Sequence, residues 1–554
     1  MQIYKSSFWF SLGTLVSRLT GLLRESITAA LFGAGTLLDS FLIANRIPNL
    51  LRDLLAEGAL GSSFTKIYAE LWENDKARAL RFFKDSLKFF SYLMLFICIL
   101  GIIFSKQLVL LTTMFLDSSE TKQIFFIHNT IGLTKILFPF IGLMTVASIF
   151  SGVLHREGRF FLSAVSPVTQ NMGYILGALY FSSLMSLAPD WWESLIAERT
   201  ISGLALGVLF GGVAYAWTQY ITIPKTIRQA ALVDSPPQSL LSVLKSSDLR
   251  RMLAMMSPML IAGSSGQINV LVNSNFATSL GEGAVSWLNC SFRLLQLPIG
   301  IFAVAVSSVA LPSLTKEVAI AKQFSQNKNA LSQKLEEALG LMLWLMTFCW
   351  AFIFANSLAI IQIIYQYGKF SYTSSLATAE SLYCYSFSLI GYGLLKVLTS
   401  FYYAIERTKY AMKISLFSIG LNATANYLLV DRFRHQGLAM TASLVISMNA
   451  LFLLVGLRKE KLAWRYPLVF RCLFFLASSF FVSVVLQNVC TRLLEASILS
   501  ALGLYSGLFL SLSLSAGITV FVFIAGSALF LKRSPFVLLR QLSRKRRHHV
   551  SNKE

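Results

Sequence analysis

The fold is decided by residues 17–64, SRLTGLLRESITAALFGAGTLLDSFLIANRIPNLLRDLLAEGALGSSF. On each side of the GAG turn at 33–35 the chain is apolar for about the 20 residues that a helix needs to cross a bilayer. Eight ionisable residues nevertheless interrupt the two apolar segments: Arg18, Arg24, Glu25, Asp39, Arg46, Arg52, Asp53 and Glu57. Charge at membrane depth is costly and is typical of helices that line a substrate pathway.

The rest of the chain has the same apolar character. Its 554 residues are 55% hydrophobic and 13% charged, with a mean hydropathy of +0.63, whereas soluble domains are about 25% charged. The apolar stretches predict about fourteen transmembrane helices, at 6–32, 37–64, 86–112, 124–153, 159–184, 202–222, 251–281, 284–311, 335–364, 377–405, 409–430, 436–457, 466–489 and 500–531. The sequence therefore predicts an all-α integral membrane protein.

Several other classes of protein are disfavoured. The six cysteines are scattered singly, so neither a disulfide framework nor a metal site is indicated. The chain has no Walker loop, HExxH or nucleophile elbow, so we expect a transporter rather than an enzyme, without a cofactor. The net charge of +22 does not indicate nucleic acid, because the basic residues sort by loop.

That sorting predicts the topology. Basic residues gather in the loops after even-numbered helices and are rare after odd-numbered ones, so both termini are predicted to be cytoplasmic. The first apolar run contains Arg18 and Arg24 and lacks a small-residue cleavage site, so it is interpreted as an uncleaved helix. The basic tail is predicted to lie along the anionic inner leaflet, as a topology anchor rather than a specific lipid site.

An internal repeat predicts the domain organisation. Residues 48–66 match residues 298–316, and the glycines at 33 and 35 match those at 281 and 283. An offset of six helices, an even number, predicts two parallel six-helix lobes, a layout typical of alternating-access transporters. The predicted parts are a first lobe at 1–222, a linker at 223–250, a second lobe at 251–457, an extra helix pair at 458–531 and a basic tail at 532–554.

Two interpretations of the charges in the first two helices remain open. The eight residues sum to zero charge and can form mutual salt bridges, for instance between Arg18 and Glu25, seven residues apart on one helix face. Against this, Arg24 and Arg52 have no obvious partner one helical turn away, so we expect them to bind an anion.

The counterpart region of the second half adds Arg293, just before Pro298. Guanidinium groups match phosphate oxygens bidentately, so converging arginines favour a phosphate or diphosphate over a cation or a neutral drug. Pro48, with Gly58 and Gly61, predicts a bent second helix whose freed carbonyl lines a cavity.

Residues 17–64 resemble the opening of MurJ/MviN, the lipid II flippase family of the multidrug/oligosaccharidyl-lipid/polysaccharide exporter superfamily. The resemblance continues in VSWLNCSFRLLQLPIGIFAVAVSSVALPSLTK at 285–316, YQYGKF at 365–370 and GLLKVLTSFYYAIERTKY at 393–410. It implies a flippase in the bacterial cytoplasmic membrane that moves the undecaprenyl-diphosphate-linked peptidoglycan precursor from the inner to the outer leaflet by alternating access. Such a role places the chain in peptidoglycan biosynthesis and hence in the maintenance of cell shape.

The resemblance also assigns roles to residues. It implies central-cavity arginines at Arg18, Arg24, Arg52 and Arg293, of which the last three form a diphosphate clamp, and supporting acidic residues at Glu25, Asp39 and Glu57. The extra helix pair corresponds to a groove for the polyprenyl tail. The implied partners are lipid II, membrane lipids, and cell-wall synthesis or division proteins.

The chain departs from the family pattern at three kinds of position. Asp53 stands where some relatives have a second arginine, and Phe292 replaces an acidic residue. The sodium site of some members matches only Asn273, Asn422 and Asn426 here, a degenerate site of neutral amides. Such amides lack the anionic oxygens that offset the dehydration of a cation, which argues against sodium coupling.

Three alternatives to a lipid II flippase stay open at this point. An exporter of another polyprenyl-linked glycan needs the same diphosphate clamp. A drug or cation antiporter of the same superfamily has the same two-lobe layout, but it is expected to bury carboxylates rather than arginines. A membrane scaffold for cell-wall enzymes requires no transport at all.

Overall fold

The computed structural model describes residues 2–116, 121–185, 196, 198–232, 243, 246–323, 328–457, 505–509, 512–513, 515–517 and 519. Every regular element in these residues is a helix, so the predicted all-α class is confirmed. The helix pair predicted within 458–531 lies almost wholly outside this part of the chain, and the tail at 532–554 lies outside it entirely.

The chain divides into two compact units, residues 1–289 with 367–374, and residues 290–366 with 375–554. This division follows contacts, whereas the predicted lobes follow the sequence repeat, and the two-lobe layout stays a prediction. The helices in the first unit are α1 (Gln2–Phe32), α2 (Thr36–Ala44), α3 (Arg46–Leu51), η1 (Arg52–Leu60), α4 (Gly61–Asn74), α5 (Lys76–Ile103), α6 (Ser105–Thr112), α7 (Thr121–Leu137), α8 (Phe140–Arg156), α9 (Phe160–Val165), α10 (Pro167–Leu176), η2 (Gly177–Phe181), α11 (Ser182–Met185), α12 (Arg199–Thr222), α13 (Lys225–Leu232) and α15 (Ser247–Ser279).

Helix α16 (Ala284–Pro298) begins in the first unit and ends in the second. The second unit continues with η4 (Ile299–Ala303), α17 (Val304–Gln323), α18 (Lys328–Tyr365), α20 (Ser388–Ala404) and α21 (Thr408–Gly456). Helix α19 (Tyr372–Ser386) begins in the first unit and continues in the second from Ser375. Helix α21 contains a break at Arg434, where φ is 50°. The break falls between the two helices predicted at 409–430 and 436–457.

Among the residues that the structure describes, five helices or helix pairs are long and apolar enough to cross a membrane, and the bent pair α19 and α20 adds a sixth candidate. These five segments are Lys76–Ile103, Thr121–Arg156, Arg199–Thr222, Ala330–Tyr365 and Thr408–Gly456. A multi-pass membrane protein follows from them, and the count of about fourteen spans stays a prediction.

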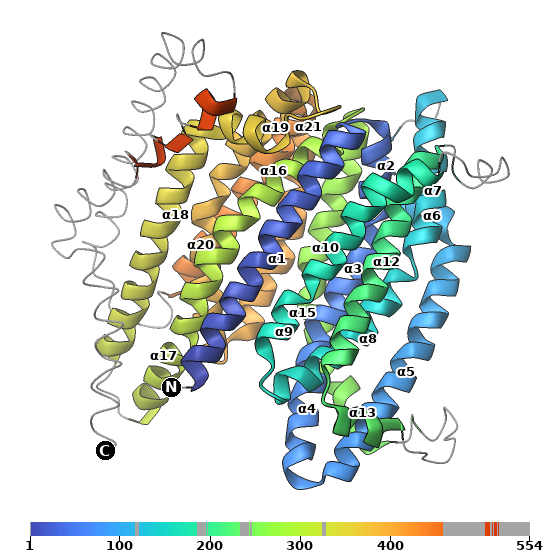
Figure 1. Cartoon of the computed structure of the whole chain (residues 1–554). Helices are drawn as coiled ribbons and strands as arrows, with labels where there is room; N and C mark the ends of the chain where they lie inside the picture. The colour runs from blue at the N-terminus through green and yellow to red at the C-terminus, as the bar shows by residue number, and fades with distance from the viewer. Residues whose placement is uncertain are drawn as a thin grey trace. The chain divides into compact units, whose positions relative to one another are not determined.

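The second predicted helix is broken into four pieces, α2, α3, η1 and α4 (Figure 1). Pro48 has no N–H for the carbonyl of Ala44, the residue at which α2 ends. From Arg52 the chain forms a π-helix, a rare geometry that is frequent at functional sites. Gly58 is required there, because a Cβ would lie 2.9 Å from the Asp53 carbonyl oxygen. A proline followed by a π-helix recurs at Pro298 and η4.

Helices α10 and α12 lie side by side and meet through glycines (Figure 1). Gly173 packs on Gly211, and Gly177 packs on Gly207, with backbone against backbone. A Cβ at Gly207 would lie 2.4 Å from the Gly177 Cα. Close contact through small residues is how membrane helices associate without a hydrophobic driving force. This contact fixes α10, which bears two residues of the site described below.

The glycine contact predicts a large cost for a side chain at Gly207. We expect Gly207→Leu to lower the unfolding free energy by about 3 kcal/mol, because the added side chain must push the two helices apart. Unfolding in mixed detergent micelles measures this change. The control Gly420→Ala, with open space around its Cβ among the described residues, should change stability by less than about 1 kcal/mol. Equal effects of the two substitutions would contradict the packing argument.

Candidate functional site

Arg24 of α1 is held from three sides within the first unit. Its Nη2 donates to Glu25 Oε1 at 2.5 Å and its Nη1 donates to Asn171 Oδ1 at 3.1 Å. The guanidinium also lies over the Tyr174 ring, 4.4 Å from the ring centroid. The side chains of Arg24 and Glu25 are only 12% and 13% exposed. Arg24 is therefore a buried cation with a fixed orientation.

Residues of α10 and α3 build the surroundings of this cation. Asn171 Nδ2 donates to Ser17 O at 3.1 Å and to Thr20 Oγ1 at 2.9 Å, which orients its oxygen toward Arg24. Asn45, between α2 and α3, donates through Nδ2 to Tyr174 Oη at 3.2 Å. Asn171 and Tyr174 thus connect the arginine on α1 to the bend in the second helix.

The expectation that Arg24 and Arg52 lack a carboxylate partner is wrong. Arg24 pairs with Glu25, and Arg52 donates through Nε and Nη2 to Asp53 Oδ1 at 3.1 and 2.7 Å. The prediction considered only partners one helical turn away, but a long arginine side chain also reaches the residue that follows it. The salt-bridge interpretation therefore holds for these two arginines in this conformation. Arg52 also lies close enough to Arg24 for the two positive charges to repel each other.

Asp39 of α2 is 3% exposed and binds the start of α16. Its carboxylate accepts hydrogen bonds from Gly283 N at 2.7 Å, Ser286 N at 2.7 Å and Ser286 Oγ at 2.5 Å. A carboxylate at a helix N-terminus satisfies orphan N–H groups and complements the helix dipole. The contact is reciprocal, because Glu282 Oε1 accepts from Thr36 N, at the start of α2, at 3.2 Å.

Comparisons with known proteins identify the family and the fold of the chain. A profile described as "Lipid II flippase MurJ" matches residues 28–528. The chain belongs to the MurJ family. It is 30% identical over 461 residues to "Lipid II flippase MurJ" of Burkholderia cenocepacia, covering 83% of this chain and 84% of that protein. A probable lipid II flippase MurJ of Buchnera aphidicola is also 30% identical, over 467 residues, covering 83% and 85%.

Solved structures share the fold of this MurJ-family chain. A lipid II flippase MurJ in an inward closed conformation matches with a TM-score of 0.72 at 22% identity, covering 94% of this chain and 99% of that chain. An inward-facing multidrug resistance MATE family transporter of the MOP superfamily matches with a TM-score of 0.63 at 15% identity, covering 82% and 98%. At these identities the likeness concerns the fold alone.

The remaining charged positions that the sequence singles out, Arg46 among the charges of the second helix and the others expected from the MurJ family, are placed as follows. Arg18 and Arg46 are half-buried on α1 and α3 of the first unit. The backbone of Glu57 lies in η1, and its side chain falls outside the described part. Arg293 is exposed on α16, with Nη1 3.4 Å from Gln296 Oε1, and belongs to the second unit. Its convergence with Arg24 and Arg52 stays a prediction.

The asparagines of the degenerate sodium site lie in both units. Asn422 and Asn426 are buried one turn apart on α21, at 2% and 0% exposure. Asn273 is half-buried on α15 of the first unit. Among the residues that the structure describes, no three His, Cys, Asp or Glu side chains form a metal cluster. The sodium site of this MurJ-family chain remains a prediction.

Sequence reasoning missed Asn171, Tyr174, Ser286 and Glu282. The signal for Asn171 was a polar side chain within the apolar stretch at 159–184, but a lone amide in such a stretch does not reveal its partner. Glu282 and Ser286 flank the glycine turn, where polar residues are ordinary. Only the packing of α1 and α2 against α10 and α16 gives these residues a role.

The Asp39 contact predicts a measurable coupling. We expect Ser286→Ala to lower the unfolding free energy by about 1.5–3 kcal/mol, because it removes a hydrogen bond to a buried carboxylate. In a double-mutant cycle with Asp39→Asn, the two losses should be clearly less than additive. The control Ser400→Ala removes a hydroxyl that bonds only the Lys396 carbonyl of its own helix, and it should have little effect. Fully additive losses would count against the contact.

Proposed function

We propose that this chain is a lipid II flippase, which moves the undecaprenyl-diphosphate-linked peptidoglycan precursor from the inner to the outer leaflet of the bacterial cytoplasmic membrane by alternating access. The observation that carries the proposal is the oriented, buried guanidinium of Arg24, within electrostatic range of Arg52, in a chain of the MurJ family. Two neighbouring guanidinium groups suit a diphosphate, because each group offers a fork of donors to phosphate oxygens.

The two carboxylates beside these arginines give the site a resting state. Burial of an unpaired charge costs several kcal/mol, so an empty cavity needs counter-ions for Arg24 and Arg52. Glu25 and Asp53 supply them, and the four residues together are neutral. A lipid diphosphate then binds by displacing the carboxylates, which return when the lipid leaves. This exchange keeps binding reversible, as transport requires.

Asp39 has a different role in this proposal from that of a substrate ligand. With both termini cytoplasmic, the GAG turn and the start of α16 lie at the outer side of the membrane. The reciprocal contacts of Asp39 with Ser286 and of Glu282 with Thr36 then close that side in this conformation. Opening the cavity to the outer leaflet requires these bonds to break.

The arginines are tested by substitution. We expect Arg24→Ala and Arg52→Ala each to weaken lipid II binding about tenfold or more and to abolish growth of a flippase-depleted strain. Arg24→Lys should restore little, because an ammonium group keeps the charge but loses the fork. Native mass spectrometry of the purified variants in a lipid II titration measures the binding.

The matched control is Arg432→Ala, at an exposed arginine whose guanidinium lies over the ring of the neighbouring Phe433. It should bind lipid II and support growth normally. Normal growth of the Arg24→Ala strain, with the protein present at the ordinary level, would overturn the proposal. A parallel titration with a polyprenyl diphosphate that bears another glycan separates lipid II from other lipid-linked sugars.

The proposed competition between Glu25 and the diphosphate predicts that one substitution strengthens lipid II binding. We expect Glu25→Gln to bind lipid II about three to ten times more tightly, because the neutral amide no longer competes with the diphosphate for Arg24. Flipping in vesicles at saturating lipid II should be slower, since release becomes harder. The control Asp431→Asn neutralises an exposed carboxylate and should change neither quantity. Weaker binding by Glu25→Gln would show that Glu25 serves the substrate rather than competing with it.

A further inference from the structure

The first described turns of α15 are fastened to the α4–α5 hairpin by two bidentate ion pairs. Arg78 of α5 donates through Nε to Asp248 Oδ2 and through Nη2 to Asp248 Oδ1, both at 2.8 Å. Arg251 donates through Nη1 and Nη2 to the two carboxylate oxygens of Glu70 on α4, at 3.0 and 2.9 Å. Parallel fork geometry of this kind is the strongest form of an exposed ion pair.

The two pairs have opposite polarity, and this makes them specific for one register. Asp248 and Arg251 lie three residues apart, hence on one face of α15. Their partners flank the hairpin turn, where Asp75 caps α5 by accepting from Arg78 N at 3.0 Å. A shift of α15 by one turn would bring Arg251 toward Arg78 or Asp248 toward Glu70. Both alternatives juxtapose like charges, so only the observed register pairs opposite charges at both positions.

Helix α15 also packs on this surface through Leu249, Met252 and Met256, which are buried in an apolar cluster with residues of α4 and α5. Apolar packing is strong but not directional. The other polar contacts at this surface are weak. Met259 Sδ accepts from Ser62 Oγ at 3.4 Å and from Ser63 Oγ at 3.8 Å, and Leu54 packs at Gly263. Sulfur is a poor acceptor, and a methionine side chain is flexible and adapts to several geometries. The ion pairs are therefore the specific part of the contact at this end of α15.

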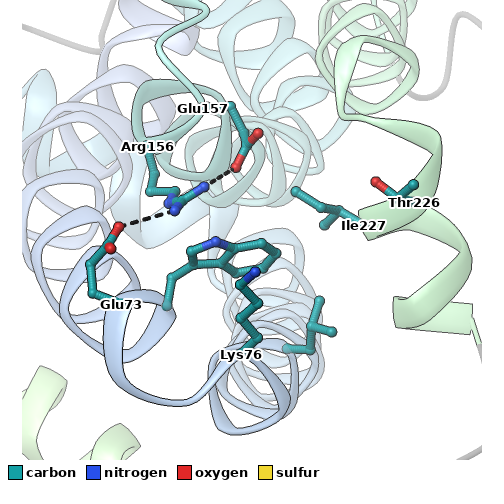
Figure 2. A pocket seen from close by; sticks show the side chains of 8 residues that line it. Glu73, Lys76, Arg156, Glu157, Thr226 and Ile227 are labelled. Carbon is teal, nitrogen blue, oxygen red and sulfur yellow. Dashed lines mark hydrogen bonds and ion pairs between the residues drawn. The ribbon is translucent and has the colours of Figure 1, made fainter.

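The hairpin is also attached to α8. Arg156 lies between Glu73 and Glu157 (Figure 2), at 3.0 and 2.5 Å. Its guanidinium also lies over the Trp72 ring, 4.7 Å from the centroid, and both residues line a pocket of about 480 Å³. This attachment joins helices that all lie in the predicted first lobe. The Asp248 and Arg251 pairs instead join the first helix of the predicted second lobe to that lobe.

We propose that the Arg78–Asp248 and Arg251–Glu70 pairs form an electrostatic latch, which holds the cytoplasmic end of α15 on the α4–α5 hairpin in this conformation and opens during transport. Three of the four side chains are 45–49% exposed, so water and salt can replace the bonds readily. The hydrogen bonds from Arg251 lower the pKa of Glu70, so this pair stays ionised around neutral pH. The inference rests on the proposed transport function for its opening step.

The latch is tested by reversing and then swapping its charges. Spin labels at Arg81→Cys on α5 and Ser247→Cys on α15, in a variant with all six native cysteines replaced by alanine, report the distance across it. We expect the short-distance population to fall at least threefold in Arg78→Glu with Arg251→Glu. The fully swapped variant, with Asp248→Arg and Glu70→Arg added, should restore it. High salt should reproduce the loss in the labelled protein that retains the native charges.

The matched control is Glu73→Lys, which breaks a pair on the same hairpin but not one with α15, and it should leave the distance unchanged. An unchanged distance in the charge-reversed variant, or no recovery in the swapped one, would overturn the latch. A lipid II titration of the same proteins separates the two proposals. If the charge-reversed variant binds lipid II normally and keeps the short spin-label distance, only the latch is overturned. If charge reversal lengthens that distance but none of the proteins binds lipid II, only the flippase proposal is overturned.

Discussion

The burial of Arg24 within α1 is the constraint on which much of the first unit depends. A guanidinium away from bulk water must be surrounded by acceptors, and here Glu25, Asn171 and the face of Tyr174 provide them. Those partners must themselves be fixed, which requires α10 to lie close to α1. The glycine contact of α10 with α12 provides that position. A cation on one helix is thus supported by the packing of two others.

Helix termini are the second organising feature. Lys369, in the segment of chain between α18 and α19, donates its backbone N–H to Ala30 O at 2.7 Å, near the end of α1. At the neighbouring turns, Asp39 serves the start of α16 and Glu282 serves the start of α2. Each terminus is satisfied by a different part of the chain rather than by its own cap. Hydrogen bonds to a distant segment break when the two segments move apart, whereas a cap from the helix's own flanking residue does not. Such bonds therefore suit helix ends that separate during transport.

The two ends of α15 differ in the chemistry of their contacts. Toward α6, Asn275 Oδ1 accepts from Met114 N at 2.7 Å and its Nδ2 donates to Leu111 O at 2.9 Å, and both Asn275 and its partners lie at a partly buried site. Toward the hairpin, the polar contacts are ion pairs in which three of the four side chains are 45–49% exposed, beside the buried apolar side chains of Leu249 and Met252. Exposed pairs contribute little net stability and are screened by salt, whereas shielded amide bonds resist exchange with water. The polar contacts at the two ends of the helix therefore differ in how readily salt can replace them.

The sequence by itself determined that the chain is helical and membrane-embedded. A chain of this apolar composition, with apolar runs long enough to cross a bilayer as helices, is stable in lipid rather than in water. The sequence also determined that the second helix is interrupted, since Pro48 cannot donate a backbone hydrogen bond, and that Arg24 and Arg52 need an explanation. It did not determine their partners. Glu25 and Asp53 directly follow the two arginines in the sequence, but helix spacing pairs residues one turn apart and does not indicate adjacent residues as ion-pair partners. Asn171 and Tyr174 are 147 and 150 residues from Arg24 along the chain. Only the tertiary structure decided which acceptors surround the buried charge and which helix end Asp39 serves, because hydrogen bonds between distant segments depend on packing that no local pattern encodes.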